Sequence, residues 1–368
     1  MMIPRLKIGK RFASIPIIQG GMSVGISLSG LASAVANAGG VGVIGSAGIG
    51  MLEKDYLRNF KEANQRVLRR EIRKTREQTK GIIGVNVLAA LSDADDLIEA
   101  ALEEEVDVIF IGAGLPLHPP KNLQKNVLRK YPTAIFPIVS SAKAARLIFK
   151  YWDMHYQHVP DGIVVEGPLA GGHLGFREEA IENPENKLEV ILPEVVNEIR
   201  IYEEKYQTEI PVVAAGGIFT GEDIDKFMRL GAKGVQMATR FVGTYECDAD
   251  DHFKKAYLDC EQKDIVIIKS PVGLPGRAIK NPFLDDVSLG KRRPLKCTWQ
   301  CLKTCNYRKV AYCINEALTN AKLGNLAEGF AFAGANAYRV KNILSVKELM
   351  KALLCEYTVA AMKVFPLP

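Results

Sequence analysis

Apolar and polar positions follow two alternating patterns along most of the chain. Short runs rich in β-branched residues recur at intervals of about 20 to 40 residues, and each is followed by apolar residues at helical spacing. The strand-like runs are residues 15–19, 41–45, 81–88, 106–112, 134–140, 162–166, 210–215 and 234–240, and the helix-like stretches are residues 28–38, 53–79, 93–105, 121–130, 142–154, 190–206 and 221–230. This alternation predicts a parallel sheet covered by helices.

The number of repeats distinguishes two kinds of parallel sheet. Eight strand–helix units are what a closed barrel requires, whereas an open doubly wound sheet usually has five or six strands. We therefore expect an α/β fold, a (β/α)8 TIM barrel. The alternation ends after residue 241, no clear series of strands follows, and residues 345–354 are amphipathic again. The sequence thus predicts a barrel of residues 1–243 and 336–368, with residues 244–335 as an inserted, smaller lid or substrate domain.

A Gly-x-Gly-x-x-Gly pattern occurs at Gly40, Gly42 and Gly45. In dinucleotide-binding folds this pattern follows a strand and opens a helix. Here a helix-like stretch precedes it and the predicted strand lies inside it. A Rossmann fold therefore loses its main support in this sequence.

Composition excludes several classes of protein. The 368 residues are 48% hydrophobic and 24% charged, as in ordinary globular proteins. The longest apolar stretch, residues 106–117, is shorter than the roughly 20 residues that span a bilayer, and no leader pattern is visible. We therefore expect no membrane association, a cytoplasmic location and reduced thiols at the seven cysteines.

Positive charge is local rather than global. The net charge is +6, and much of the excess lies in residues 66–80 and 291–303, so nucleic acid is not implied as a partner. Acidic residues are interleaved in the first stretch, which is typical of a solvated helix face. A docking patch for an acidic carrier protein is the second interpretation of residues 66–80.

Glycine is frequent where the predicted strands end. QGGM occupies residues 19–22 after the first strand, EGPLAGGH residues 166–173 after the sixth, and AGG residues 215–217 after the seventh. In such barrels these ends form the active-site face, and glycine lets backbone N–H groups approach a ligand. Loops after strands seven and eight commonly hold phosphate, which here predicts a site at Gly216, Gly217, Ala238 and Thr239.

His173 is the candidate catalytic residue. It follows two glycines beyond a predicted strand, so its ring is expected to project into the mouth of the barrel, where an imidazole can act as acid or base. The other four histidines lie beside prolines, polar residues or charges and are expected at the surface: His118, His155, His158 and His252.

Four cysteines form a C-x3-C-x3-C-x7-C pattern, at Cys297, Cys301, Cys305 and Cys313. This spacing is neither that of paired zinc ligands nor that of the usual ferredoxins. On a helix, a spacing of four would put three thiols on one face, where they could simply be buried. A metal or cluster is the alternative, and we assign no metal ligand from the sequence.

Six segments together resemble the nitronate monooxygenase family, formerly called 2-nitropropane dioxygenases, which includes the FMN-dependent enoyl-acyl-carrier-protein reductases of the second type. They are residues 19–22 (QGGM), 31–45 (LASAVANAGGVGVIG), 84–86 (GVN), 166–175 (EGPLAGGHLG), 214–217 (AAGG) and 234–241 (GVQMATRF). The match covers most of residues 15–244 in the same order.

The resemblance implies an FMN-binding barrel with a smaller lid domain. By matching positions, Met22 and Asn86 would contact the flavin ring or ribityl chain, His173 would be the catalytic histidine, and the phosphate would lie at the site already predicted. The expected FMN-binding residues are Gly20, Gly21, Met22, Asn86, Glu166, Gly171, Gly172, Ala215, Gly216, Gly217, Gln236, Met237, Ala238 and Thr239. The family usually has glycine where this chain has Ala238, which places a methyl group beside the phosphate.

Two activities follow from the resemblance. A nitronate monooxygenase oxidises an alkyl nitronate with dioxygen to a carbonyl compound and nitrite, with His173 near the nitro group. The alternative is an NAD(P)H-dependent enoyl-acyl-carrier-protein reductase, in which His173 would polarise or protonate the enoyl thioester. A flavoprotein that binds without turnover is a third possibility. The monooxygenase ranks first because no dinucleotide site is recognisable, and the oligomeric state stays open between monomer and homodimer.

Overall fold

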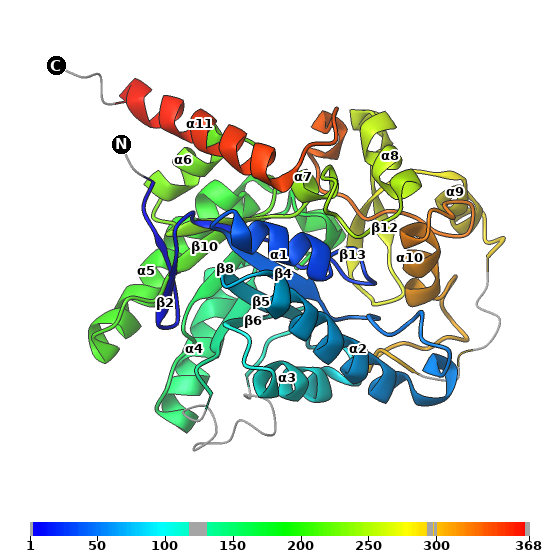
Figure 1. The fold of residues 1–368 in the computed structure, drawn as a ribbon, viewed down its shortest axis with the longest axis horizontal. Helices are drawn as coiled ribbons and strands as arrows, with labels where there is room; N and C mark the ends of the chain where they lie inside the picture. The colour runs from blue at the N-terminus through cyan, green and yellow to red at the C-terminus, as the bar shows by residue number, and fades with distance from the viewer. Residues whose placement is uncertain (1–2, 118–130, 293–296, 298–299, 365–368) are drawn as a thin grey trace.

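The computed structural model describes residues 3–117, 131–292, 297 and 300–364. Eight parallel strands close into a barrel in the order β10-β11-β3-β4-β5-β6-β7-β8 (Figure 1). These strands are β3 (Ile17–Gln19), β4 (Val41–Gly45), β5 (Ile82–Leu88), β6 (Val108–Gly112), β7 (Ala134–Val139), β8 (Ile163–Glu166), β10 (Val212–Ala215) and β11 (Gly234–Met237). Each begins inside one of the eight predicted runs, so the predicted TIM barrel is confirmed.

Helices surround the barrel where the sequence predicts them. They are α1 (Ser29–Asn37), α2 (Tyr56–Gln78), α3 (Ala94–Glu103), α4 (Ala142–Tyr156), α5 (Leu188–Tyr206), α6 (Gly221–Arg229) and α11 (Val346–Val364). The C-terminal α11 packs against α6 and α1, which confirms that the last barrel helix comes from the end of the chain (Figure 1). The predicted helix at residues 121–130 lies outside the described residues. No helix in the described ranges has the length and apolar character needed to cross a bilayer.

The predicted eighth strand, residues 234–240, is too long. The strand ends at Met237, and a short helix, α7 (Thr239–Val242), begins two residues later. Residues 239–240 therefore belong to a helix rather than to the sheet. The apolar pattern could not distinguish the end of strand β11 from helix α7, because a four-residue helix is too short to show a helical period.

Two apolar layers hold the barrel. Inside it, Phe110 and Phe136 meet edge to face at 5.7 Å between ring centroids, and both are fully buried. Outside it, strand residues pack against the helices, where the indole of Trp152 is buried and donates a hydrogen bond to the carbonyl of Pro116 at 2.8 Å. Burying each such aromatic side chain contributes roughly 2 kcal/mol to stability.

An N-terminal hairpin closes one end of the barrel. The hairpin pairs β1 (Leu6–Ile8) with β2 (Arg11–Ala13), and Leu6 belongs to the cluster of side chains inside the barrel. A Cβ placed on Gly234, the first residue of β11, would lie 3.0 Å from Leu6. The hairpin therefore fills the end at which the strands begin and leaves their carboxyl ends for a ligand.

Gly42 shows a structural reason for the Gly-x-Gly-x-x-Gly pattern at residues 40–45. It lies within β4, and a Cβ there would come 1.8 Å from the carbonyl oxygen of Ala32 in α1. The glycine is needed because helix and strand touch closely. The pattern is thus a packing feature of a barrel strand, and the sequence argument against a Rossmann fold is confirmed by the closed sheet.

The segment between α7 and α11 differs from the prediction. It contains α8 (Asp251–Asp259), β12 (Ile265–Lys269), β13 (Pro275–Ile279), α9 (Pro282–Ser288) and α10 (Ile314–Lys322). The expectation of no strand series was wrong, because β12 and β13 pair antiparallel and β13 also pairs with β9 (Gly172–His173). The two strands are short, and the second begins with proline, which weakens the strand signal. The proposed domain boundaries at residues 243/244 and 335/336 stay a prediction.

A buried glutamine connects β3 and β4, the two neighbouring barrel strands that share the fewest residue pairs. Strands β3 and β4 share one residue pair, Ile18 with Val41. Beyond it, the fully buried Gln19 accepts a hydrogen bond from the N–H of Val43 at 2.9 Å and donates one to the carbonyl of Gly20 at 2.6 Å. The side-chain amide therefore replaces main-chain bonds that the two strands do not make.

Replacing Gln19 with leucine is expected to lower the free energy of unfolding by about 1–3 kcal/mol, because the buried N–H of Val43 loses its acceptor. Chemical denaturation of the purified protein measures the change. The matched control is Gln262→Leu at an exposed position, expected to stay within about 0.5 kcal/mol of the wild type. Equal stability of the two variants would contradict the assigned role of Gln19.

Candidate active site

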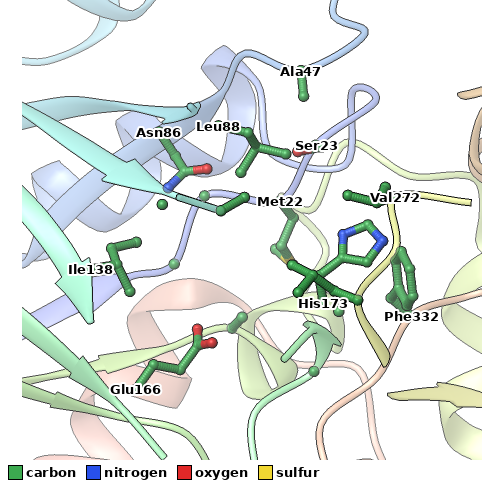
Figure 2. Close-up of a pocket in the computed structure, with 18 of the residues that line it drawn as sticks. Met22, Ser23, Ala47, Asn86, Leu88, Ile138, Glu166, His173, Val272 and Phe332 are labelled. Atoms are coloured by element: carbon green, nitrogen blue, oxygen red, sulfur yellow. The ribbon is translucent and has the colours of Figure 1, made fainter. Parts of the chain in front are cut away.

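A cavity of about 480 Å3 opens at the carboxyl ends of the barrel strands. Its wall includes residues from the ends of β3, β5, β8 and β11 and from the segment that follows α7 (Figure 2). The predicted site residues that line it are Gly20, Gly21, Met22, Asn86, Glu166, Gly171, Gly172, His173, Gln236, Ala238 and Thr239. The fold therefore brings together segments that are up to about two hundred residues apart, as expected for this face of a barrel.

A second, smaller cavity of about 80 Å3 adjoins the first. The two share Glu166, Gly171 and Gln236 among their lining residues. The remaining predicted residues line the smaller one: Ala215, Gly216, Gly217 and Met237. All of the predicted site residues thus line one or both of two adjoining cavities, and their roles stay predictions.

The smaller cavity offers unpaired backbone donors. Among the described residues, the N–H groups of Gly216, Gly217 and Thr239 have no hydrogen-bond acceptor. Gly216 and Gly217 have φ angles of +93° and +87°, in the left-handed region, and a Cβ on Gly216 would come 2.7 Å from the carbonyl of Gly167. All three residues are half-buried, and N–H groups that face a cavity without a protein acceptor fit an anion such as a phosphate.

Two glycines in the wall of the larger cavity pack closely against neighbouring parts of the protein. A Cβ on Gly21 would lie 2.4 Å from the Cβ of Asn86, and one on Gly171 would lie 2.5 Å from the backbone nitrogen of Gly334. The Ala238 methyl group lies 3.4 Å from the position of a Cβ on Gly20. This part of the cavity wall is therefore built largely of backbone and small side chains.

Glu166 places a carboxyl group in the wall of the larger cavity. Glu166, Ala215 and Gln236 are side by side in the register of β8, β10 and β11. Burial, with no charged or hydrogen-bonding neighbour to oppose it, raises the pKa of the Glu166 carboxyl to about 7. The group is therefore protonated in about half of the molecules at neutral pH and adds little fixed negative charge to the cavity.

His173 lies across the cavity from Glu166. In the view of Figure 2, Asn86, Ile138 and Glu166 stand on one side, and His173, Phe332 and Val272 on the other. Burial lowers the pKa of the His173 imidazole to about 4, so the ring is neutral at physiological pH. A neutral imidazole has one donor nitrogen and one acceptor nitrogen.

Two contacts orient the His173 ring. Its Nε2 shares a hydrogen bond of 2.6 Å with the Ser270 hydroxyl, and Phe332 packs edge-on at 4.9 Å between ring centroids. Either Nε2 accepts from Ser270 and Nδ1 carries the proton, or Nε2 donates and Nδ1 is free to accept one. The ring can therefore serve as a hydrogen-bond donor or as a base without a change of position.

The inserted segment holds the backbone of His173. The sequence placed His173 in the loop after the sixth predicted strand, and the structure places it seven residues after the end of β8, in β9, where it pairs with Gly276 of β13. The buried guanidinium of Arg277 donates 2.6 Å hydrogen bonds to the carbonyls of Pro168 and Ala170. Barrel loop and inserted hairpin are thus joined through main-chain and side-chain bonds.

Sequence reasoning missed several residues of this site. Ser270, Arg277 and Phe332 lie roughly 100 or more residues beyond the motif they contact, in a segment without a recognisable pattern. The apolar run at residues 265–268 was an available strand signal. Pairing with His173, however, depends on the tertiary fold.

Among the described residues that line the two cavities, Glu166 and His173 are the only acidic and basic side chains. Within the described residues, neither cavity is lined by lysine or arginine. On α2, the arginines of the basic stretch pair with carboxylates, for example Arg66 with Asp55 at 2.7 Å and Arg73 with Glu104 at 2.6 Å. Residues 66–80 therefore match the interpretation as a solvated helix face. The second interpretation, a docking patch for an acidic carrier protein, gains no support.

Comparison with known proteins gives one family and several relatives. The sequence model described as nitronate monooxygenase matches residues 6–356. A Mycobacterium tuberculosis protein named (3aS,4S,5R,7aS)-5-hydroxy-7a-methyl-1-oxo-octahydro-1H-indene-4-carboxyl-CoA dehydrogenase is 27% identical over 369 residues, which cover 93% of this chain and 92% of that protein. A Staphylococcus aureus protein named probable nitronate monooxygenase is 29% identical over 306 residues, or 74% of this chain and 77% of that one. The structure of FabK from Thermotoga maritima superposes with a TM-score of 0.72 at 27% identity and covers 95% of both chains.

Glu166→Gln tests the electrostatics of the cavity. Because burial raises this carboxyl pKa from 4.5 to about 7, the folded state holds a proton that the unfolded state has lost, so wild-type stability falls as pH rises through this interval. Glutamine does not ionise, so the variant is expected to become more stable than the wild type by about 1–3 kcal/mol as pH increases from about 5 to about 8.

Denaturation of the cofactor-free protein at several pH values measures this difference. The control is Glu182→Gln at an exposed turn, which should follow the wild type throughout the range. A Glu166→Gln variant that tracks the wild type at every pH would show that the carboxyl is not buried as described.

Proposed function

The chain belongs to the nitronate monooxygenase family of oxidoreductases, and we propose that it is an FMN-dependent nitronate monooxygenase that oxidises alkyl nitronates with dioxygen. The products are a carbonyl compound and nitrite. The observation that carries this proposal is a neutral His173 in a cavity that is otherwise mostly apolar and has no lysine or arginine among its described lining residues. This environment suits a small polar head attached to an apolar body.

The two adjoining cavities suit FMN. The unpaired N–H groups of Gly216, Gly217 and Thr239 would hold the phosphate, and the part of the larger cavity lined by Gly21 and Gly171 would take the flat ring, beside Met22 and Asn86. FMN, when bound, supplies an electron acceptor that can react with dioxygen. The chain contributes a flat, water-poor site of low net charge.

The nitro group is expected to lie against His173. In the tautomer with Nδ1 protonated, the ring donates a hydrogen bond to a nitronate oxygen while Ser270 holds Nε2 at 2.6 Å. In the other tautomer, Nδ1 can accept the α-proton of a neutral nitroalkane. His173 therefore orients a nitronate or generates one, and Ser270 positions the ring in both cases.

Apolar side chains line the part of the cavity in which the alkyl part of the substrate would lie. Val272, Leu274, Leu302 and Leu318 line the same cavity beyond His173 and come from the segment after α7. Apolar contact with these side chains excludes water from the reacting end and favours an alkyl chain over a free polar group. We therefore infer a preference for alkyl nitronates longer than the simplest ones.

A flavin-dependent enoyl thioester reductase is the second candidate. It is favoured by the likeness to FabK, which extends over 95% of both chains, and by the same apolar wall, which could take an acyl chain. A reductase of this kind must also admit a reduced nicotinamide dinucleotide. The absence of lysine and arginine from the described cavity lining leaves its diphosphate without a charged partner inside the site, and this ranks the reductase second.

His173→Ala is expected to lower turnover of an alkyl nitronate by about 10²- to 10⁴-fold, because the group that orients the nitro end is lost. FMN content should stay near the wild-type level, since His173 is not among the residues proposed to hold the phosphate. Steady-state nitrite release and flavin absorbance measure both quantities. The control, His155→Ala at an exposed position on α4, should leave turnover unchanged. Full activity of His173→Ala would remove His173 from the mechanism.

Anaerobic mixing distinguishes the two candidates. The purified yellow protein is mixed without oxygen with NADH, NADPH or an alkyl nitronate while absorbance near 450 nm, a region typical of oxidised flavin, is followed. Loss of this absorbance with nitronate alone is the expected result. Rapid loss with NADH or NADPH would favour the reductase, and a colourless protein without FMN would contradict both proposals.

A further inference from the structure

Residues 333–336 reach the smaller cavity from a part of the chain far from its other walls. This bridging segment, Ala-Gly-Ala-Asn, follows the inserted hairpin, and its Gly334 and Asn336 line the smaller cavity. The glycine-rich loops that form the rest of the wall lie roughly 100 or more residues earlier in the chain. Neither Gly334 nor Asn336 is among the residues that the sequence predicts for the site, and the function proposed above gives them no role.

Main-chain donors fix the bridging segment against two of these loops. The N–H of Ala335 donates to the carbonyl of Leu169, in the loop after β8, at 3.1 Å. The N–H of Gly334 donates to the Oγ1 of Thr239, at the start of α7, at 3.3 Å. A Cβ on Gly334 would lie 2.7 Å from the same Oγ1, so the segment and the start of α7 are in close contact. The Thr239 hydroxyl accepts from Gly334 and keeps its own proton available for a ligand.

The side chain of Asn336 holds a third loop, the one after β10. Its Nδ2 donates to the carbonyl of Gly217 at 2.6 Å, and Asn336 itself is half-buried. Within the described residues, no main-chain N–H outside helices and strands donates to this carbonyl. Gly217 has a φ angle of +87°, in the left-handed region. The direction of its carbonyl is therefore held by a side chain rather than by secondary structure.

This contact also determines where the next N–H points. A peptide unit is planar and trans, so its C=O and N–H point in opposite directions. Because Asn336 holds the Gly217 carbonyl, the N–H of Ile218 faces away from that amide. Ile218 is buried and lines the smaller cavity, and its N–H has no acceptor among the described residues. Together with the N–H groups of Gly216 and Gly217, it makes three consecutive donors without a protein partner.

The smaller cavity depends on such dipoles because it lacks cations. Its described lining includes no lysine, arginine or histidine. An anion there must be held by N–H and O–H groups, and a carbonyl oxygen turned toward it would repel it. The orientation of the peptide between Gly217 and Ile218 therefore affects anion affinity in two ways, since rotation would remove a donor and introduce an acceptor.

We propose that Asn336 is a positioning residue of the phosphate site, and that its bond to Gly217 lets this site select a flavin mononucleotide over the same flavin without phosphate. This inference rests on the FMN site proposed above and extends it to a residue of the bridging segment. Asn336 acts through the Gly217–Ile218 peptide and needs no contact with the flavin ring. Its contribution should therefore appear for a phosphorylated ligand and disappear when the phosphate is absent.

A purely structural role gives a different expectation. If Asn336 only kept the loop after β10 in place, its loss would disturb the cavity as a whole. FMN and riboflavin, which share the ring and the ribityl chain, would then lose affinity by the same factor. The ratio of the two dissociation constants therefore separates phosphate positioning from general support of the fold.

Flavin titration of the full-length protein tests the proposal. Flavin-free protein is prepared by dialysis, and the dissociation constants of FMN and riboflavin are measured from the change in flavin fluorescence. Asn336→Leu keeps a similar side-chain size but cannot donate a hydrogen bond. It is expected to weaken FMN binding by about 5- to 20-fold, the effect of one lost hydrogen bond, and to leave riboflavin binding at the wild-type level.

Two further variants accompany this measurement. Asn342→Leu, at an exposed position on the same side of the bridging segment in the chain, is the matched control and should bind both flavins like the wild type. Asn336→Ala removes the same donor with a smaller side chain and replaces Asn336→Leu if leucine disturbs the fold. Circular dichroism verifies folding of each variant.

Three results would overturn the inference. Asn336 variants that bind FMN like the wild type, or that weaken FMN and riboflavin equally, would remove Asn336 from phosphate positioning. A wild-type protein that binds riboflavin as tightly as FMN would show that no phosphate site exists here. None of these readouts depends on turnover, so a protein with the expected flavin affinities but no nitrite release would contradict only the proposed function.

Discussion

The site depends on the antiparallel pairing of β9 with β13. This pairing joins a two-residue strand from the rim of the barrel to a hairpin about one hundred residues later in the chain. It places the His173 ring against Ser270 and Phe332, and Arg277 next to it holds the glycine-rich loop by two carbonyls. Without the hairpin, the loop that carries His173 would have no partner for its backbone and no fixed direction for the ring.

Burial then determines the charge of the cavity. The same low-dielectric surroundings raise the Glu166 pKa and lower the His173 pKa, so both groups are driven toward their neutral forms. In addition, the described lining residues include no lysine or arginine. The result is a cavity with little fixed charge among its described lining residues, so few charged groups compete for a polar ligand atom. Unpaired backbone N–H groups in the smaller cavity are then the obvious place for an anion.

Much of the fold was predictable because its signals are local. Alternating β-branched and amphipathic segments identified eight barrel strands, and glycines after the first, sixth and seventh of them marked the residues that line the cavities. Errors occurred where local signals are weak. Strands β12 and β13 were missed, the end of β11 was extended into α7, and the four cysteines were considered on a helix that the described residues do not form. Short elements carry too few residues for a period to be distinguished from chance.

The sequence by itself determined the class of barrel, the face on which the cavities open and the position of His173 in the wall of the larger one. These follow from periodicity, glycine placement and chain order, which are properties of neighbouring residues. Only the tertiary structure decided that Ser270 and Phe332 orient the ring and that Gln19 bridges β3 and β4. Such contacts join residues far apart in the chain, and their formation depends on loop closure and burial, which no local pattern encodes.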